Sequence, residues 1–104
     1  MVKHIILWKL KSGLSDAEKK DVSAGIKRGL EGLAGVVPGL ISIRVRSGCE
    51  GSSADLMLDS SFEDRSALES YRTDPRHVEV ADRYVRPFIE VRLCMDYEVE
   101  DHEG

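Results

Sequence analysis

The sequence predicts an α+β domain with the ferredoxin-like element order βαββαβ. Four segments alternate apolar and polar residues with a period of two, as half-buried strands do: residues 2–10, 40–46, 54–60 and 91–99. After the first and third of these segments, apolar residues instead recur every three or four positions, as they do along a helix. The 104 residues suffice for one modest core, and no linker or repeat divides them, so we expect a single domain over 1–104.

The first helix has a clear start signal. Ser15 and Glu18 form the S-x-x-E pattern of a capping box, directly after the first strand and its Gly13 turn. One apolar face follows, made of Val22, Ile26, Leu30 and Leu33. Each of three glycines weakens this helix by about 1 kcal/mol relative to alanine. They therefore predict close packing against the sheet: Gly25, Gly29 and Gly32.

The second helical region is predicted to consist of two pieces. We expect Ser61 to cap the first piece, with Glu63 and Asp64 in its first turn, where negative charge is favourable. Asp74 is a good N-cap and Pro75 fits the first position of a helix. A short helix is therefore predicted over 75–86, ended by Pro87. We expect the acidic tail over 100–104 to be frayed.

Neither face of the predicted sheet is suited to water. The last strand presents one fully apolar face, made of Val91, Leu93, Met95, Tyr97 and Val99. Its other face carries ionisable groups, including Arg92, Cys94 and Asp96. If the helices cover one face of the sheet, a second copy of the sheet is the best cover for the other. The sequence therefore predicts a two-fold homodimer.

Composition and charge exclude several classes of protein. A net charge of −4 without a basic stripe argues against nucleic-acid binding, which depends on Lys and Arg neutralising phosphates. The apolar run in MVKHIILWKLK is too short to span a membrane and lacks the features of a signal peptide, so we expect a cytoplasmic protein. Cys49 and Cys94 are then expected to be free thiols. Neither a metal-ligand spacing nor a nucleotide-binding loop is present, and we expect no metal and no cofactor.

The segment YRTDPRHVEV, residues 71–80, holds the candidate catalytic groups Tyr71 and His77. His77 lies in the first turn of its predicted helix, where free amide groups favour a neutral ring that can accept a proton. Asp96 is expected to take the other ring N–H, and Tyr71 to donate a hydrogen bond to a carbonyl or enolate oxygen. The alternative is that these side chains only pack and hydrogen-bond, holding the short helix against the sheet.

Three stretches carry a resemblance to a known family: VKHIILWKLK at the start, Y-x-x-x-P-x-H from Tyr71 to His77, and DYE at Asp96 to Glu98. Nearly the whole chain resembles the stress-responsive dimeric A/B barrel family. The resemblance implies a ferredoxin-like protomer, a dimeric α/β barrel and a cavity between sheet and helices. One branch, the plant polyketide cyclase that forms olivetolic acid, performs an aldol cyclisation without cofactor, using a tyrosine and a histidine that correspond here to Tyr71 and His77.

The resemblance also implies a set of ligand-binding residues: His4, Ile6, Trp8, Val22, Ile26, Leu58, Arg92, Cys94 and Asp96. Taken alone, His4 on an apolar strand is more typical of a hydrogen-bonded core histidine than of a ligand-binding residue. Trp8 is more typical of the core or its wall, and it offers a stacking surface only if a cavity exists. Arg92 departs from the cyclase, which has an aliphatic residue there. It fits either an ion pair with Asp96 or an anionic ligand such as a carboxylate. The substrate of the cyclase therefore does not transfer to this chain.

Three functions remain open at this point. The first is binding of a small organic ligand, with cofactor-free acid–base chemistry next to a carbonyl. The second is a non-catalytic stress or assembly protein. The third is a cofactor-independent monooxygenase, because such enzymes share the dimeric barrel.

Overall fold

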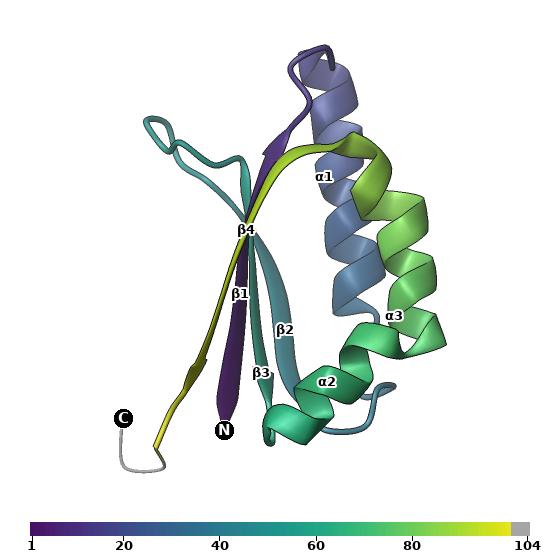
Figure 1. Ribbon diagram of the computed structural model, residues 1–104. Helices are drawn as coiled ribbons and strands as arrows, with labels where there is room; N and C mark the ends of the chain where they lie inside the picture. The colour runs from purple at the N-terminus through teal and green to yellow at the C-terminus, as the bar shows by residue number, and fades with distance from the viewer. Residues whose placement is uncertain (101–104) are drawn as a thin grey trace.

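The computed structural model describes residues 1–100 and confirms the predicted ferredoxin-like fold. Four strands, β1 (Val2–Leu10), β2 (Leu40–Ser47), β3 (Leu56–Phe62) and β4 (Ile89–Glu98), form one antiparallel sheet in the order β2-β3-β1-β4. The helices α1 (Asp16–Glu31), α2 (Arg65–Thr73) and α3 (Pro75–Val80) all lie on one side of it, as Figure 1 shows. None of the helices within residues 1–100 is both long and apolar enough to span a bilayer.

Several predicted boundaries are confirmed by their caps. Glu18 N–H donates to Ser15 Oγ at 3.1 Å, and Ser15 N–H donates to Glu18 Oε1 at 3.0 Å, which completes the capping box of α1. Asp74 caps α3, whose first residue is Pro75. The predicted frayed tail lies outside the described residues from position 101 onward.

Ser61 does not cap α2, and this prediction was wrong. The β3 strand runs to Phe62, because Phe62 still pairs with Val2 and Leu40 in the neighbouring strands. The cap is instead Asp64, whose Oδ1 accepts from Ala67 N–H at 2.8 Å. The first turn of α2 consequently carries no acidic residue.

The helix predicted over 75–86 is not regular. After α3, residues Ala81–Val85 form a π-helical turn (η1), and Arg86–Phe88 form a 3-10 turn (η2) that leads into β4. Pro87 lacks an N–H donor, so an α-helical ladder cannot continue through it. The chain therefore reaches the sheet earlier than predicted, and β4 begins at Ile89, which pairs with Leu10.

The core lies between the sheet and the helices. Its fully buried members include Ile26 from α1, Phe62 from β3 and Tyr71 from α2. Gly29 packs against helical residues rather than the sheet, which corrects the prediction. A Cβ there would lie 3.0 Å from Val80 and 3.1 Å from Tyr84, so glycine lets α1 and η1 approach closely.

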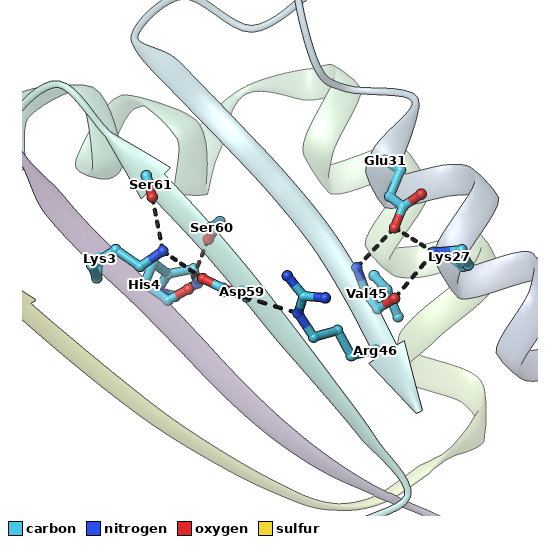
Figure 2. A network of polar contacts seen from close by, with 9 residues as sticks. All are labelled: Lys3, His4, Lys27, Glu31, Val45, Arg46, Asp59, Ser60 and Ser61. Atoms are coloured by element: carbon cyan, nitrogen blue, oxygen red, sulfur yellow. Dashed lines mark hydrogen bonds and ion pairs between the residues drawn. The ribbon is translucent and has the colours of Figure 1, made fainter. Parts of the chain in front are cut away.

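The outer face of the sheet is divided into a polar and an apolar half. Toward β2 and β3, Lys3 Nζ donates to Asp59 at 2.5 Å and to Ser61 at 2.9 Å, and Arg46 lies 3.9 Å from Asp59 (Figure 2). Toward β4, five exposed apolar side chains lie on this face: Leu7, Val91, Leu93, Met95 and Tyr97. We call these five residues the apolar outer face.

At Val45, side chains of α1 bind the backbone on the free edge of β2. Glu31 Oε2 accepts from Val45 N–H at 2.9 Å, and Lys27 Nζ donates to Val45 O at 3.2 Å (Figure 2). Lys27 and Glu31 also pair with each other at 2.8 Å. Two backbone groups of an edge strand, which otherwise invite another strand to pair, thereby have partners within the chain.

Substitution of three glycines by alanine tests how closely the chain packs around each of them. Gly39 has φ +80°, and a Cβ there would lie 2.5 Å from Ala67 Cβ. Gly35 has φ +76° with open space around it, and Gly13 has open space and no positive φ. We expect Gly39→Ala to lower the free energy of unfolding by roughly 2–3 kcal/mol, Gly35→Ala by about 1 kcal/mol, and Gly13→Ala by less than about 0.5 kcal/mol. Urea unfolding measures all three, and equal values for Gly39→Ala and Gly35→Ala would contradict the close contact.

Candidate functional site

A cavity of about 320 Å³ lies between the helix-facing side of the sheet and the segment from α2 to η2. Seven of the predicted site residues line it: His4, Ile6, Trp8, Leu58, Tyr71, His77 and Arg92. Its remaining lining was not predicted as part of a site: Leu30, Arg72, Ala81, Val85, Arg86, Ile89 and Glu90. The lining is mixed, with apolar walls and ionisable groups from both the sheet and the helices.

Four of the predicted ligand-binding residues do not line this cavity. Ile26 is fully buried in the core. Val22 packs beside the core and borders a separate surface groove next to Tyr84. Cys94 and Asp96 lie on β4 and contact His4, but they do not line the cavity.

Tyr71 and His77 meet although the α2–α3 junction separates them in sequence. Their rings stack with centroids 4.0 Å apart and planes inclined by 29°. The junction is set by Asp74, which ends α2 and caps α3, so that His77 falls on the first turn of the new helix. The predicted meeting of these two side chains is therefore present.

Both groups of this stack carry a buried polar atom that has no hydrogen-bond partner among the described residues: Tyr71 Oη and His77 Nδ1. Burial raises the pKa of the Tyr71 phenol, so the hydroxyl stays protonated and remains a donor at neutral pH. Burial lowers the pKa of His77, and the positive charge of Arg86 acts in the same direction. The carbonyls of Arg72 and Tyr71 oppose this shift without forming a hydrogen bond to Nδ1.

Asp96 contacts His4 rather than His77, which corrects the predicted partner. His4 and Asp96 are paired directly across β1 and β4, and His4 Nδ1 lies 2.5 Å from Asp96 Oδ1. Arg72 donates to the other oxygen of Asp96 at 2.6 Å. The ion pair considered between Arg92 and Asp96 is likewise not formed, because Arg72 and His4 hold both carboxylate oxygens.

The Asp96 contact fixes the protonation pattern of His4. A carboxylate can accept but not donate, so Nδ1 carries the proton and Nε2 of the neutral ring is left as an acceptor. Burial lowers the pKa of His4, although the hydrogen bond to Asp96 opposes this effect. Burial alone would raise the pKa of the Asp96 carboxyl, but hydrogen bonds from His4 and Cys94 and the charge of Arg72 lower it. The pair is therefore a neutral histidine on a carboxylate at neutral pH.

His4, Cys94 and Asp96 also bring three potential metal ligands within 4.8 Å of one another. Two ligands on one tetrahedral zinc ion are about 3.4 Å apart, since each lies about 2.1 Å from the metal. The 2.5 Å between His4 Nδ1 and Asp96 Oδ1 fits a shared proton better. With Arg72 on the second oxygen of Asp96, the cluster is better suited to hydrogen bonding than to holding a cation.

Some of the cavity-lining residues that the sequence analysis did not predict could have been found from their spacing. Ala81 and Val85 follow His77 at successive spacings of four, which places all three on one helical face. Arg72 had no such signal, because its partner Asp96 lies on a strand 24 positions later. Cys94 and His4, which approach to 3.7 Å, are likewise joined only by strand pairing.

Solved structures with the same fold include proteins of different kinds. A dimeric protein of unknown function with a ferredoxin-like fold from Bacteroides fragilis is 30% identical with a TM-score of 0.88, covering 94% of this chain and 95% of that chain. Hydroxynitrile lyase from Passiflora edulis is 16% identical with a TM-score of 0.72, covering 99% and 96% of the two chains. An antibiotic biosynthesis monooxygenase is 13% identical with a TM-score of 0.74, covering 96% and 99%. The last two likenesses concern the fold alone.

No curated protein matches the chain significantly. The model of the stress responsive A/B barrel domain, in contrast, matches residues 2–99, a range that includes every strand and helix described above. The chain belongs to the stress responsive A/B barrel domain family.

Proposed function

We propose that this protein is a homodimer whose protomers each bind a small organic molecule in the cavity and act on it by cofactor-free acid–base chemistry next to a carbonyl. The observation that carries this proposal is the cavity of about 320 Å³ beside two buried polar atoms without partners, Tyr71 Oη and His77 Nδ1. An unsatisfied buried group costs roughly 1–3 kcal/mol, and buried polar groups in native proteins nearly always have partners. A ligand that reaches these atoms would remove the cost.

The proposed chemistry follows from the protonation states. Tyr71, which stays protonated, donates to the carbonyl oxygen of the ligand and stabilises the enolate that forms there. A neutral histidine removes the proton from the adjacent carbon. His4 is suited to this role because Asp96 orients its ring and stabilises the cation that it becomes.

His77 is the second candidate for the proton acceptor. It is also neutral, it lines the cavity, and it stacks on Tyr71. It differs from His4 in lacking a carboxylate partner among the described residues. The two assignments therefore respond differently to substitution of Asp96.

The homodimer is supported by the apolar outer face. Leu93 and Met95 are 63% and 65% exposed, and they lie together with Leu7 on one side of β1 and β4. Contiguous apolar surface of this kind marks an interaction site. A second copy that stacks its sheet on this face matches the dimeric description of the Bacteroides fragilis protein.

Tyr71→Phe separates ligand binding from packing. The substitution removes a buried hydroxyl without a partner, so we expect the free energy of unfolding to stay equal or rise by up to about 1 kcal/mol. Ligand affinity or turnover is expected to fall at least tenfold, because the donor to the carbonyl is lost. Urea unfolding and binding calorimetry measure the two effects. A loss of stability with unchanged binding would favour the purely structural role of Tyr71.

Asp96→Asn distinguishes the two histidines. If His4 is the proton acceptor, Asp96→Asn and His4→Gln should each lower kcat by about 10²- to 10⁴-fold, with little change in KM. His77→Gln should then lower kcat far less. If His77→Gln instead lowers kcat strongly and Asp96→Asn lowers it only slightly, His77 is the proton acceptor.

The lowered histidine pKa values predict a fall in stability toward acid. The unfolded chain binds protons near pH 6.5, whereas buried His4 and His77 stay neutral to lower pH. The unfolded state thus binds more protons below about pH 6.5, and the free energy of unfolding falls there. Asp96, with its lowered pKa, contributes stability that is lost only below about pH 4. Its titration therefore does not overlap the pH range in which the two histidines titrate. Urea unfolding from pH 7.5 to 5 should show a shallower fall for His77→Gln. An unchanged slope would contradict the burial of a neutral ring.

The dimer can be tested by placing charge on the apolar outer face. We expect Met95→Lys to yield a folded monomer in sedimentation velocity, since two buried lysines at a two-fold interface repel each other. Val36→Lys is the matched control, because Val36 is also exposed, at 47%, but lies outside the sheet. A wild-type protein that sediments as a monomer, or a Met95→Lys variant that remains dimeric, would contradict this interface.

A further inference from the structure

We propose that the cavity selects ligands that carry a carboxylate or a similar anionic group, and that Arg92 binds this group. The inference rests on the proposed ligand binding and adds the chemical class of the ligand. It also assigns Arg92 a specificity-determining role that is separate from the acid–base groups Tyr71, His4 and His77.

The cavity lining is rich in arginine, although the protein as a whole is acidic. Three arginines line it, Arg72, Arg86 and Arg92, together with one acid, Glu90. Both lining histidines have a lowered pKa and are neutral near pH 7. The chain as a whole carries a net charge of −4, so this concentration of guanidinium groups is local. A guanidinium group in such a cleft that has no carboxylate partner attracts a ligand group of the opposite charge.

Two of the three arginines already have carboxylate partners. Arg72 pairs with Asp96 at 2.6 Å and with Glu69 at 3.4 Å. Arg86 pairs with Asp82 one helical turn earlier. Arg92 forms no ion pair with any described residue among positions 1–100. Its planar guanidinium thus keeps the donor geometry that binds a carboxylate through two parallel hydrogen bonds.

Strand pairing places Arg92 where it can hold one end of a ligand. Arg92 lies directly across from Trp8 in the β1–β4 ladder, and Trp8 and Ile6 belong to the apolar wall of the cavity. Its positive charge also acts on His4, which lies further along the same side of the sheet. A ligand with its carboxylate on Arg92 therefore lays its apolar part along Trp8 and Ile6, toward His4 and Tyr71.

The test compares two probes that differ in charge but hardly in shape, 3-phenylpropanoate and 3-phenylpropanamide. Trp8 is the chain's one tryptophan, is buried and lines the cavity, so its fluorescence reports on binding, and neither probe absorbs at the excitation wavelength. We expect the wild-type protein to bind the acid about tenfold more tightly than the amide at low salt. This preference should shrink as sodium chloride is raised, because added ions screen an exposed charge.

Arg92→Gln should abolish the preference for the acid, and it should lower the affinity for the amide much less than the affinity for the acid, because a neutral carbonyl forms the weaker hydrogen bond with a guanidinium. Arg83→Gln is the matched control, since Arg83 lies over the Tyr84 ring and does not line the cavity. Arg83→Gln should retain the wild-type preference. Equal affinities for acid and amide in the wild type, or a preference that survives Arg92→Gln, would overturn this inference and leave ligand binding intact. Failure of both probes to bind would overturn the inference and the proposed ligand binding together.

Discussion

The cavity and the apolar outer face both depend on the register in which β1 pairs with β4. Side chains alternate between the two faces of a strand, so the register places His4, Trp8, Arg92 and Asp96 toward the helices. The same register places the apolar residues Leu7, Leu93 and Met95 on the opposite side. A slip of β4 by one residue would turn Arg92 and Asp96 to the outer face and carry Leu93 and Met95 to the helix-facing side. The cavity and the apolar outer face are therefore two results of one alignment, and neither can change without the other.

The helical side of the site depends on an interruption rather than on a regular element. Asp74 ends α2 and begins α3, and this change of direction lets the Tyr71 ring lie flat against His77 six positions later. In one continuous helix, residues six apart lie on different faces, so such stacking would not occur. The irregular η1 and η2 turns then bring the chain back to the sheet and close the cavity with Val85 and Ile89. The cavity is therefore formed where the helical region is interrupted, at the α2–α3 junction and at the η1 and η2 turns.

Local signals in the sequence were sufficient for the fold and for the Tyr71–His77 segment, whereas the strand residues of the site followed only from the family resemblance. Alternating apolar residues predicted the strands, and the Ser15–Glu18 and Asp74–Pro75 caps predicted where two helices begin, because caps and periodicity act over a few residues. The Ser61 cap failed because strand pairing with Val2 and Leu40 extended β3, which no local signal reveals. Asp96 was assigned to His77 instead of His4 for the same reason. A partner 92 positions away is set by register, and register is a property of the whole sheet.

Lys27 and Glu31, which bind the edge of β2, limit how copies of this chain can associate. Because Lys27 and Glu31 hold the backbone of Val45, an incoming strand meets an occupied position at this border. Unlimited growth by strand addition requires both borders of the sheet to be available, as in fibrils. The occupied backbone of Val45 therefore disfavours growth into a ribbon at this border, whereas it leaves two copies free to stack face to face.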